Sequence, residues 1–210
     1  MKSKTVVLIA AIAMFGVAAG AQTAKKLTSP ATFNEKAPDA YKASFDTSAG
    51  TFVVEVHRDW DPSGADRFYN LVKSGFYDDC RFYRVISNFM VQWGLNGDPS
   101  VTAAWVQAHF KDEPVKEGNK EGYIAFAKPS APANMRTTQV YINFKDNRSV
   151  LDQQGFSAFG KVASGMNVVN KIYSGYGGNL DQGKIQTQGN AYLKKEFPKL
   201  DYIKKATIVE

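Results

Sequence analysis

The residue with the most unusual surroundings for its chemistry is Arg84, which lies within an aromatic and aliphatic run. On a β-strand, side chains two positions apart share a face, so Arg84 is expected beside Phe82 and Ile86. A guanidinium there can direct several N–H donors at one polar group. The alternative is an arginine whose stem packs at the rim of the fold while its head stays in water. The next predicted strand brings three further side chains: Phe89, Met90 and Gln92.

The groups that usually carry nucleophilic, acid–base or metal chemistry are few. Cys80 has no histidine near it in sequence, and a lone cysteine is more often an inert buried residue. His57 and His109 are expected to be surface or packed residues, and two histidines are too few for a multi-histidine metal site. Neighbouring carboxylates occur at Asp59/Asp61, Asp78/Asp79 and Asp112/Glu113. Nothing selects one pair for two-carboxylate hydrolysis, and no phosphate-binding glycine motif follows a strand. We therefore predict neither a metal nor a cofactor.

Length and composition describe an ordinary globular protein. The chain has 210 residues, of which 44% are hydrophobic and 22% charged, and its formal net charge is +6. These values are typical of one domain with a sizeable core, and they exclude a disordered or collagen-like chain. A single cysteine excludes an intramolecular disulfide framework and a cysteine-based zinc or iron–sulfur site. The modest positive charge does not by itself indicate nucleic-acid binding, and none is predicted.

The first 21 residues have the pattern of a secretory signal peptide. Lys2 and Lys4 precede an apolar run from Val6 to Ala18, which is shorter than the ~20 residues of a membrane-spanning helix. Small residues at 19–21 then offer a cleavage site, with Gln22 as the first mature residue. We predict export to the periplasm or the medium, with no stable membrane insertion after cleavage. An uncleaved membrane anchor is the alternative.

Periodicity predicts the elements that must position the candidate residues. Residues 22–40 lack a pattern and are expected to form a flexible linker before a domain at 41–210. Alternating apolar residues around a turn at 47–50 predict a β-hairpin. Asp61-Pro62 predicts the start of a helix that ends at Gly75. Further strands are expected at 82–86, 89–93, 123–127, 139–144, 156–162 and 202–209, and a second helix at 166–173.

Many short strands, two distant helices and no strand–helix alternation favour an antiparallel barrel, closed or nearly closed, with helices at its ends. Two long segments do not fit this scheme. Residues 95–121 are polar and residues 174–190 are rich in Gly and Gln, so both are expected to be loops. Long ordered loops are often functional, but plain surface excursions are the alternative.

Several spaced motifs resemble those of the cyclophilin family of peptidyl-prolyl cis/trans isomerases. Residues 82–92, Phe-Tyr-Arg-Val-Ile-Ser-Asn-Phe-Met-Val-Gln, are similar to the family signature Phe-x-Arg-(Ile/Val)-Ile-x-x-Phe-x-(Ile/Val/Cys)-Gln-Gly-Gly. The other matching motifs are Gln139–Ile142, Leu151-Asp152, Phe159–Val162 and Gly165–Val169. The resemblance extends over residues 41–209. It implies a mainly β fold, a closed eight-stranded antiparallel barrel capped by two α-helices.

The same resemblance implies a site. Its catalytic residues would be Arg84 and Gln92. Its substrate-binding residues would be Phe89, Met90, Gln139, Tyr141, Leu151, Phe156, Ala127 and Lys128. The sequence departs from the family pattern at Trp93, which stands in place of a glycine, and at Val150, where a Trp or Phe often lines the groove.

The implied function is a monomeric peptidyl-prolyl isomerase that assists the folding of exported proteins by acting on their Pro-containing segments. An alternative of another class is a catalytically weak module of this fold that binds Pro-containing peptides as a chaperone or scaffold. Trp93 and Val150 favour that alternative, whereas Arg84 and Gln92 favour the enzyme. A third possibility, a barrel carrying a small apolar ligand, needs a hollow interior. The bulky aromatic strands instead predict a filled interior.

Overall fold

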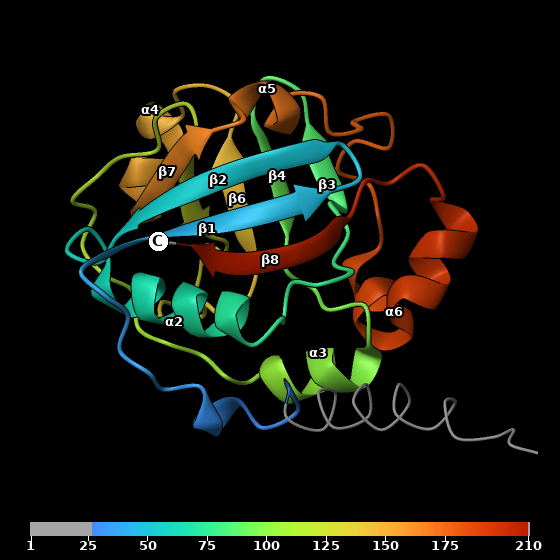
Figure 1. Ribbon diagram of the computed structural model, residues 1–210, viewed down its shortest axis with the longest axis horizontal. Coiled ribbons are helices and arrows are strands. Elements are labelled where there is room, and N and C mark those ends of the chain that lie inside the picture. Colours follow the sequence, from blue (N-terminus) through green and yellow to red (C-terminus); the bar gives the residue numbers. More distant parts are fainter. Residues whose placement is uncertain (1–26, 210) are drawn as a thin grey trace, which may run out of the picture.

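The structure, a computed structural model, describes residues 27–209 (Figure 1). Over this part of the chain, eight strands form one curled antiparallel sheet with helices at its ends. The predicted signal peptide and its cleavage site lie outside the described residues. None of the described helices is long and apolar enough to cross a membrane.

The sheet has the order β3-β4-β6-β5-β7-β2-β1-β8, and the paired strands are antiparallel. This confirms the mainly β class and the eight antiparallel strands. The expected hairpin corresponds to the first two strands, whose ladder ends where Thr47 lies opposite Gly50. The strands are β1 (Ala40–Thr47), β2 (Gly50–His57), β3 (Arg84–Ile86), β4 (Met90–Trp93), β5 (Tyr123–Phe126), β6 (Val140–Asn143), β7 (Ala158–Ser164) and β8 (Ile203–Val209).

The expected closure of the barrel is not found, because the sheet stays open between β3 and β8. These edge strands share no ladder, and one isolated bridge between Arg81 and Tyr202 connects the segments that precede them. A loop covers the edge that β8 would need: the Val85 N–H donates to the Gly177 carbonyl at 3.0 Å. Because β3 is only three residues long, this contact leaves little edge for a further strand.

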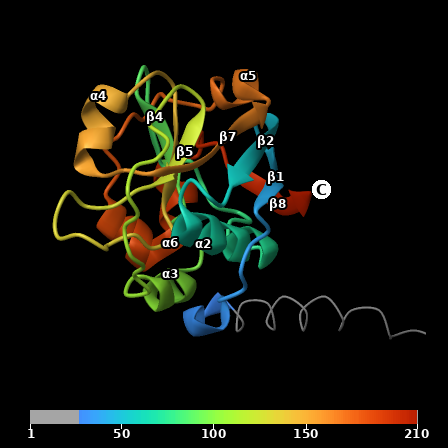
Figure 2. The same ribbon diagram turned by 90° about the vertical axis from the view of Figure 1, so that its left-hand side faces the viewer.

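Helix α2 (Pro62–Lys73) is the helix that Asp61-Pro62 predicts. The Asp61 carboxylate accepts a hydrogen bond from the Gly64 N–H at 2.8 Å, as an N-cap does. Proline at the first helical position has no N–H to leave unpaired. Gly75 follows the helix with a φ of +75°, a left-handed conformation that favours glycine. Helices α2 and α3 (Pro99–Trp105) lie at one end of the curled sheet and α5 (Met166–Val169) at the other (Figures 1 and 2).

Both segments expected to be loops contain helices, and the expected second helix is short. Helix α3 (Pro99–Trp105) lies in the first segment and α6 (Gln182–Glu196) begins in the second. The expected helix at 166–173 is reduced to the four residues of α5 (Met166–Val169). Gly189 interrupts α6 with a φ of 56° and a ψ of −141°, so α6 depends on tertiary packing more than on a continuous helical pattern. The remaining turns are α4 (Arg148–Leu151), η1 (Pro30–Thr32) and η2 (Asp152–Gln154).

Aromatic rings fill the interior of the curled sheet. Trp93 is fully buried, and its ring lies edge-on to Phe82 at 5.4 Å and to Phe45 at 5.8 Å between centroids. Since side chains alternate along β4, Trp93 points into this interior while Gln92 points to the other side. The departure from the family pattern at Trp93 therefore enlarges the core.

Part of the segment expected to be a linker packs against the domain. The Leu27 carbonyl accepts a hydrogen bond from Trp105 Nε1 at 2.7 Å, and the Phe33 ring lies 5.3 Å from that indole. Asn70 of α2 donates to the Glu35 carbonyl at 2.7 Å. These contacts join residues far apart in sequence, so periodicity within 22–40 could not reveal them.

Cys80 is fully buried, and burial raises the pKa of its thiol well above the ordinary value. Since the thiolate is the reactive form, we expect the native protein to resist thiol reagents and to run as a monomer without reductant. Reagent uptake, measured before and after unfolding in guanidinium, checks this. Labelling should appear only after unfolding. Rapid labelling of the folded protein, or a substantial reducible dimer, would contradict the expectation.

Candidate active site

A pocket of about 420 Å³ lies on the side of β4 opposite the aromatic core. All ten residues that the sequence analysis assigned to a site line it: Arg84, Gln92, Phe89, Met90, Gln139, Tyr141, Leu151, Phe156, Ala127 and Lys128. Five others that were not predicted complete the wall: Pro129, Met135, Thr137, Gln182 and Gln186. Val150 is 52% exposed and is not among the lining residues.

Strand register aligns the polar centre of the pocket. Arg84 of β3 lies opposite Gln92 of β4, and Gln92 lies opposite Tyr141 of β6. Residues directly opposite on antiparallel strands have adjacent side chains on one face. Side chains from three strands are therefore held in one row across the sheet.

A short chain of hydrogen bonds fixes the arginine. Arg84 Nη1 donates to Gln92 Oε1 at 2.9 Å. Gln92 Nε2 in turn donates to Gln139 Oε1 at 2.9 Å and to the Tyr83 hydroxyl at 3.1 Å. The Tyr83 hydroxyl also donates to Gln139 Oε1. With both of its amide atoms occupied, Gln92 holds the Arg84 guanidinium at the pocket rather than free in solvent.

Tyr83 is a supporting residue that the sequence analysis did not identify. It precedes Arg84, just outside β3, and its ring packs in a separate cluster with Leu180 and Ile185 of the α6 region. Burial raises the pKa of the Tyr83 hydroxyl well above its ordinary value, so the group remains a donor. Its role becomes visible through its hydrogen bonds to two predicted site residues, Gln92 and Gln139.

The floor of the pocket is apolar and separate from the main core. Met90, Tyr141, Leu151 and Phe156 form its buried cluster, with Phe89 packed beside them at lower burial. The Tyr141 and Phe156 rings lie edge to face, 6.0 Å apart and inclined by 78°. A concave apolar surface beside a few fixed polar groups is typical of a ligand site.

Asn119, in a segment expected to be a loop, forms hydrogen bonds to two residues of this floor, Tyr141 and Phe156. Its Oδ1 accepts from the Tyr141 hydroxyl at 2.6 Å, and its Nδ2 donates to the Phe156 carbonyl and to Asp152 Oδ1, both at 2.8 Å. Asn119 is fully buried, so all these bonds are shielded from water. No local pattern distinguishes this asparagine from the polar residues around it.

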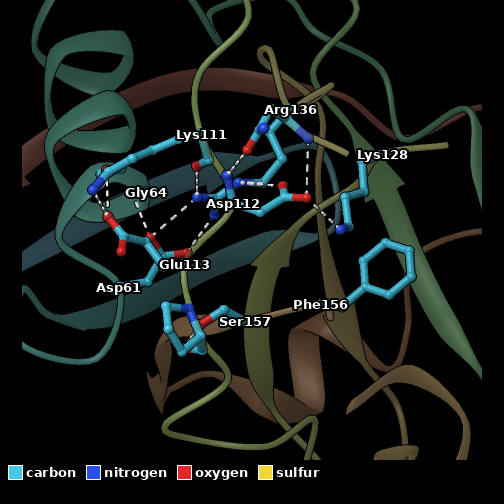
Figure 3. A network of polar contacts seen from close by, with 12 residues as sticks. Asp61, Gly64, Lys111, Asp112, Glu113, Lys128, Arg136, Phe156 and Ser157 are labelled. Carbon is cyan, nitrogen blue, oxygen red and sulfur yellow. Dashed lines mark hydrogen bonds and ion pairs between the residues drawn. The ribbon is translucent and has the colours of Figure 1, made fainter. Parts of the chain in front are cut away.

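A network of polar contacts supports the pocket wall that contains Lys128 (Figure 3). Lys128 Nζ lies 2.7 Å from Asp112 Oδ2 and 5.6 Å from the Phe156 ring centroid. Asp112 also faces Arg136, which pairs with Asp61 at the start of α2. Burial acts to raise the pKa of Asp112, but hydrogen bonds from Lys128 and the Asn134 N–H more than offset it, so the pKa lies below its ordinary value. Lys128 is thus held as a paired cation in the wall.

Comparison with known families decides the identity. The family model described as "Cyclophilin type peptidyl-prolyl cis-trans isomerase/CLD" matches residues 42–193. The chain belongs to this family. It is a cyclophilin-type peptidyl-prolyl cis-trans isomerase, as the motifs indicated.

Curated relatives of this cyclophilin carry the same description. "Peptidyl-prolyl cis-trans isomerase B" of Escherichia coli is 30% identical over 76% of this chain and 94% of its own length. The "Peptidyl-prolyl cis-trans isomerase" of Acinetobacter baylyi is 35% identical over 60% of this chain and 68% of its own. A cyclophilin-type isomerase from Cryptosporidium parvum has a similar fold, with a TM-score of 0.61 at 20% identity over 81% of this chain and 98% of that one.

Proposed function

We propose that this cyclophilin isomerises X–Pro bonds in exported proteins, in the periplasm or the medium, and so assists their folding. Arg84 is its catalytic residue and the apolar floor holds the proline ring. The observation that carries the assignment is the Arg84 guanidinium, held by Gln92 beside an apolar pocket. Export follows from the signal-peptide pattern in the sequence.

The reaction breaks no covalent bond. Its barrier is the partial double bond of the imide, ~18–20 kcal/mol for a peptide C–N bond. The uncatalysed exchange takes roughly tens to hundreds of seconds. A catalyst therefore needs no nucleophile, metal or cofactor. It needs a surface that binds the twisted bond more tightly than the planar one.

Arg84 supplies that difference. As the imide twists, its nitrogen loses conjugation and gains a lone pair that can accept a hydrogen bond. A fixed guanidinium N–H donates to this nitrogen only in the transition state, which lowers the barrier. Gln92 acts as a positioning residue, since its Oε1 accepts from Arg84 and its Nε2 is anchored on Gln139.

The floor supplies binding. A proline ring is apolar and compact, and Phe89, Met90 and Leu151 offer apolar surface beside Arg84. Burying such a ring gains free energy in proportion to the apolar area removed from water. This binding is shared by both isomers, so it affects substrate affinity more than turnover.

The alternative, a weakly active module that binds Pro-containing peptides, retains one supporting observation. Val150 is exposed and leaves the groove without the aromatic side chain common in the family. Trp93 no longer favours it, because its ring is buried in the core. Refolding of an exported protein limited by prolyl isomerisation separates the two functions. The enzyme accelerates it at substoichiometric amounts, whereas a binding module acts only near equal concentration or slows it.

Export has its own test. We expect cleavage before Gln22, so the exported protein should lack residues 1–21. Intact-mass measurement of the periplasmic or secreted protein checks this directly. A mass that retains Met1–Ala21 would show an uncleaved anchor, and recovery only from the cytoplasm would remove exported proteins as clients.

A further inference from the structure

Helix α6 is the part of the pocket wall that neither the motifs nor the proposed mechanism uses. Gln182 and Gln186 line the same pocket as Arg84. They are four residues apart on a helix, so their side chains lie one turn apart on one face. Together they contribute one helical turn of α6 to the pocket wall.

Both amides are available for a ligand. Within the described part of the chain, neither side chain makes a hydrogen bond, and each is only partly buried. A side-chain amide carries a donor pair and an acceptor, as a peptide unit does. Such a group can pair with the N–H and the C=O of an extended chain, and it does so without charge. In contrast, Gln92 and Gln139 already hydrogen-bond to each other, and Gln92 also accepts from Arg84.

The wall is held firmly in place. Ile185, between the two glutamines, is fully buried in the cluster that contains the Tyr83 ring. Farther along α6, the Asn190 N–H donates to the Gly97 carbonyl, and its side chain donates to the Asp79 carbonyl, both at 2.9 Å. A fixed helix orders its two glutamines at lower entropic cost than a mobile loop would.

The loop before α6 brings this wall against the catalytic strand. Val85 donates to Gly177, and a Cβ added at Gly178 would lie 3.4 Å from Arg84 Nε. Gly178 thus lies beside the arginine, and a side chain at this position would touch it. A peptide that places its X–Pro bond at Arg84 can continue along α6 on that side, where Gln182 and Gln186 line the same pocket.

We propose that Gln182 and Gln186 form an extended subsite that binds the peptide backbone flanking the isomerised X–Pro bond. This inference rests on the proposed use of the pocket for Pro-containing peptides. This subsite favours extended, unfolded peptide segments over tight turns, and it requires no charged residue in the peptide. Longer peptides therefore bind more tightly than a tetrapeptide.

The test compares two substrates with one Ala-Pro bond each: a tetrapeptide and an extended peptide of roughly ten residues. For the double variant Gln182→Ala/Gln186→Ala, loss of two neutral hydrogen bonds should lower kcat/KM on the longer peptide by about tenfold, mainly through KM. Activity on the tetrapeptide should fall much less, because a short peptide does not extend along both glutamines. Gln188→Ala is the matched control, since Gln188 is exposed on the same helix and outside the pocket.

Two results would overturn the subsite: a wild type that gains nothing from the longer peptide, or a double variant that keeps the gain. The tetrapeptide assay distinguishes failure of the subsite from failure of the proposed function. A wild type that is inactive on the tetrapeptide would contradict the proposed catalytic mechanism but not the subsite. In that case, anisotropy of a labelled longer peptide decides the subsite by binding. Weaker binding by the double variant, but not by Gln188→Ala, supports it, and equal binding overturns it.

Discussion

Replacing Arg84 by Ala should lower kcat/KM on Pro-containing peptides by about 10²–10³-fold, the effect of deleting one transition-state donor. The guanidinium is the only catalytic donor that the mechanism uses, and Gln92 fixes its direction at 2.9 Å. Arg84→Lys should restore little, because the charge survives but the planar fork does not. The measurement is isomerase activity of folded variants, with circular dichroism as the control for folding.

Phe89→Ala is the contrasting variant. Its ring belongs to the apolar floor, so its loss should mainly weaken peptide binding and raise KM. If folded Arg84→Ala keeps most of the wild-type activity, the assigned mechanism is wrong. If the wild type binds Pro-containing peptides without turnover, the binding-module alternative replaces the enzyme.

Replacing Trp93 by Ala should lower the free energy of unfolding by about 3–5 kcal/mol, the range for removing a large aromatic side chain from a packed core. Trp93 is fully buried, and its ring contacts those of Phe45, Phe52 and Phe82. Its Nε1 has no hydrogen-bond partner among the described residues, so Trp93→Phe removes no such bond and should cost less. Denaturant unfolding provides the measurement.

Trp60 offers a matched control. It stacks between His57, at 4.3 Å, and Tyr123, at 5.6 Å, on a partly exposed surface. Trp60→Ala should therefore cost only about 1 kcal/mol, the scale of a surface aromatic pair. Equal losses for the two substitutions would show that the Trp93 ring is not a core element.

Much of the fold could be predicted because it depends on local periodicity, whereas the site residues were assigned through the resemblance to family motifs. Period-two alternation placed the β1–β2 hairpin, and Asp61-Pro62 placed the start of α2. The residues assigned through the family motifs all line one pocket, since the strand register sets Arg84, Gln92 and Tyr141 side by side. Side-chain alternation also explains why Trp93, beside a site residue, lies in the core.

The features that were not predicted depend on contacts between distant segments. Helix α6 contains an interruption at Gly189 and is stabilised by packing against Tyr83. Asn119 acts through bonds to Tyr141 and Asp152, which lie far along the chain. The open edge of the sheet follows from the loop at Gly177, which no strand pattern indicates. In each case the decisive partner lies outside any local window.

Arg84 is expected to speed the exchange of a bound X–Pro peptide between its cis and trans forms. Two-dimensional exchange NMR measures this directly, since cis and trans peptide signals exchange magnetisation only when isomerisation is fast. With catalytic amounts of the mature protein, cross-peaks should appear for the wild type and vanish for Arg84→Ala, while both proteins still broaden the peptide signals by binding. Cross-peaks of equal strength for Arg84→Ala, or none for a wild type that binds the peptide, would show that Arg84 does not catalyse the exchange.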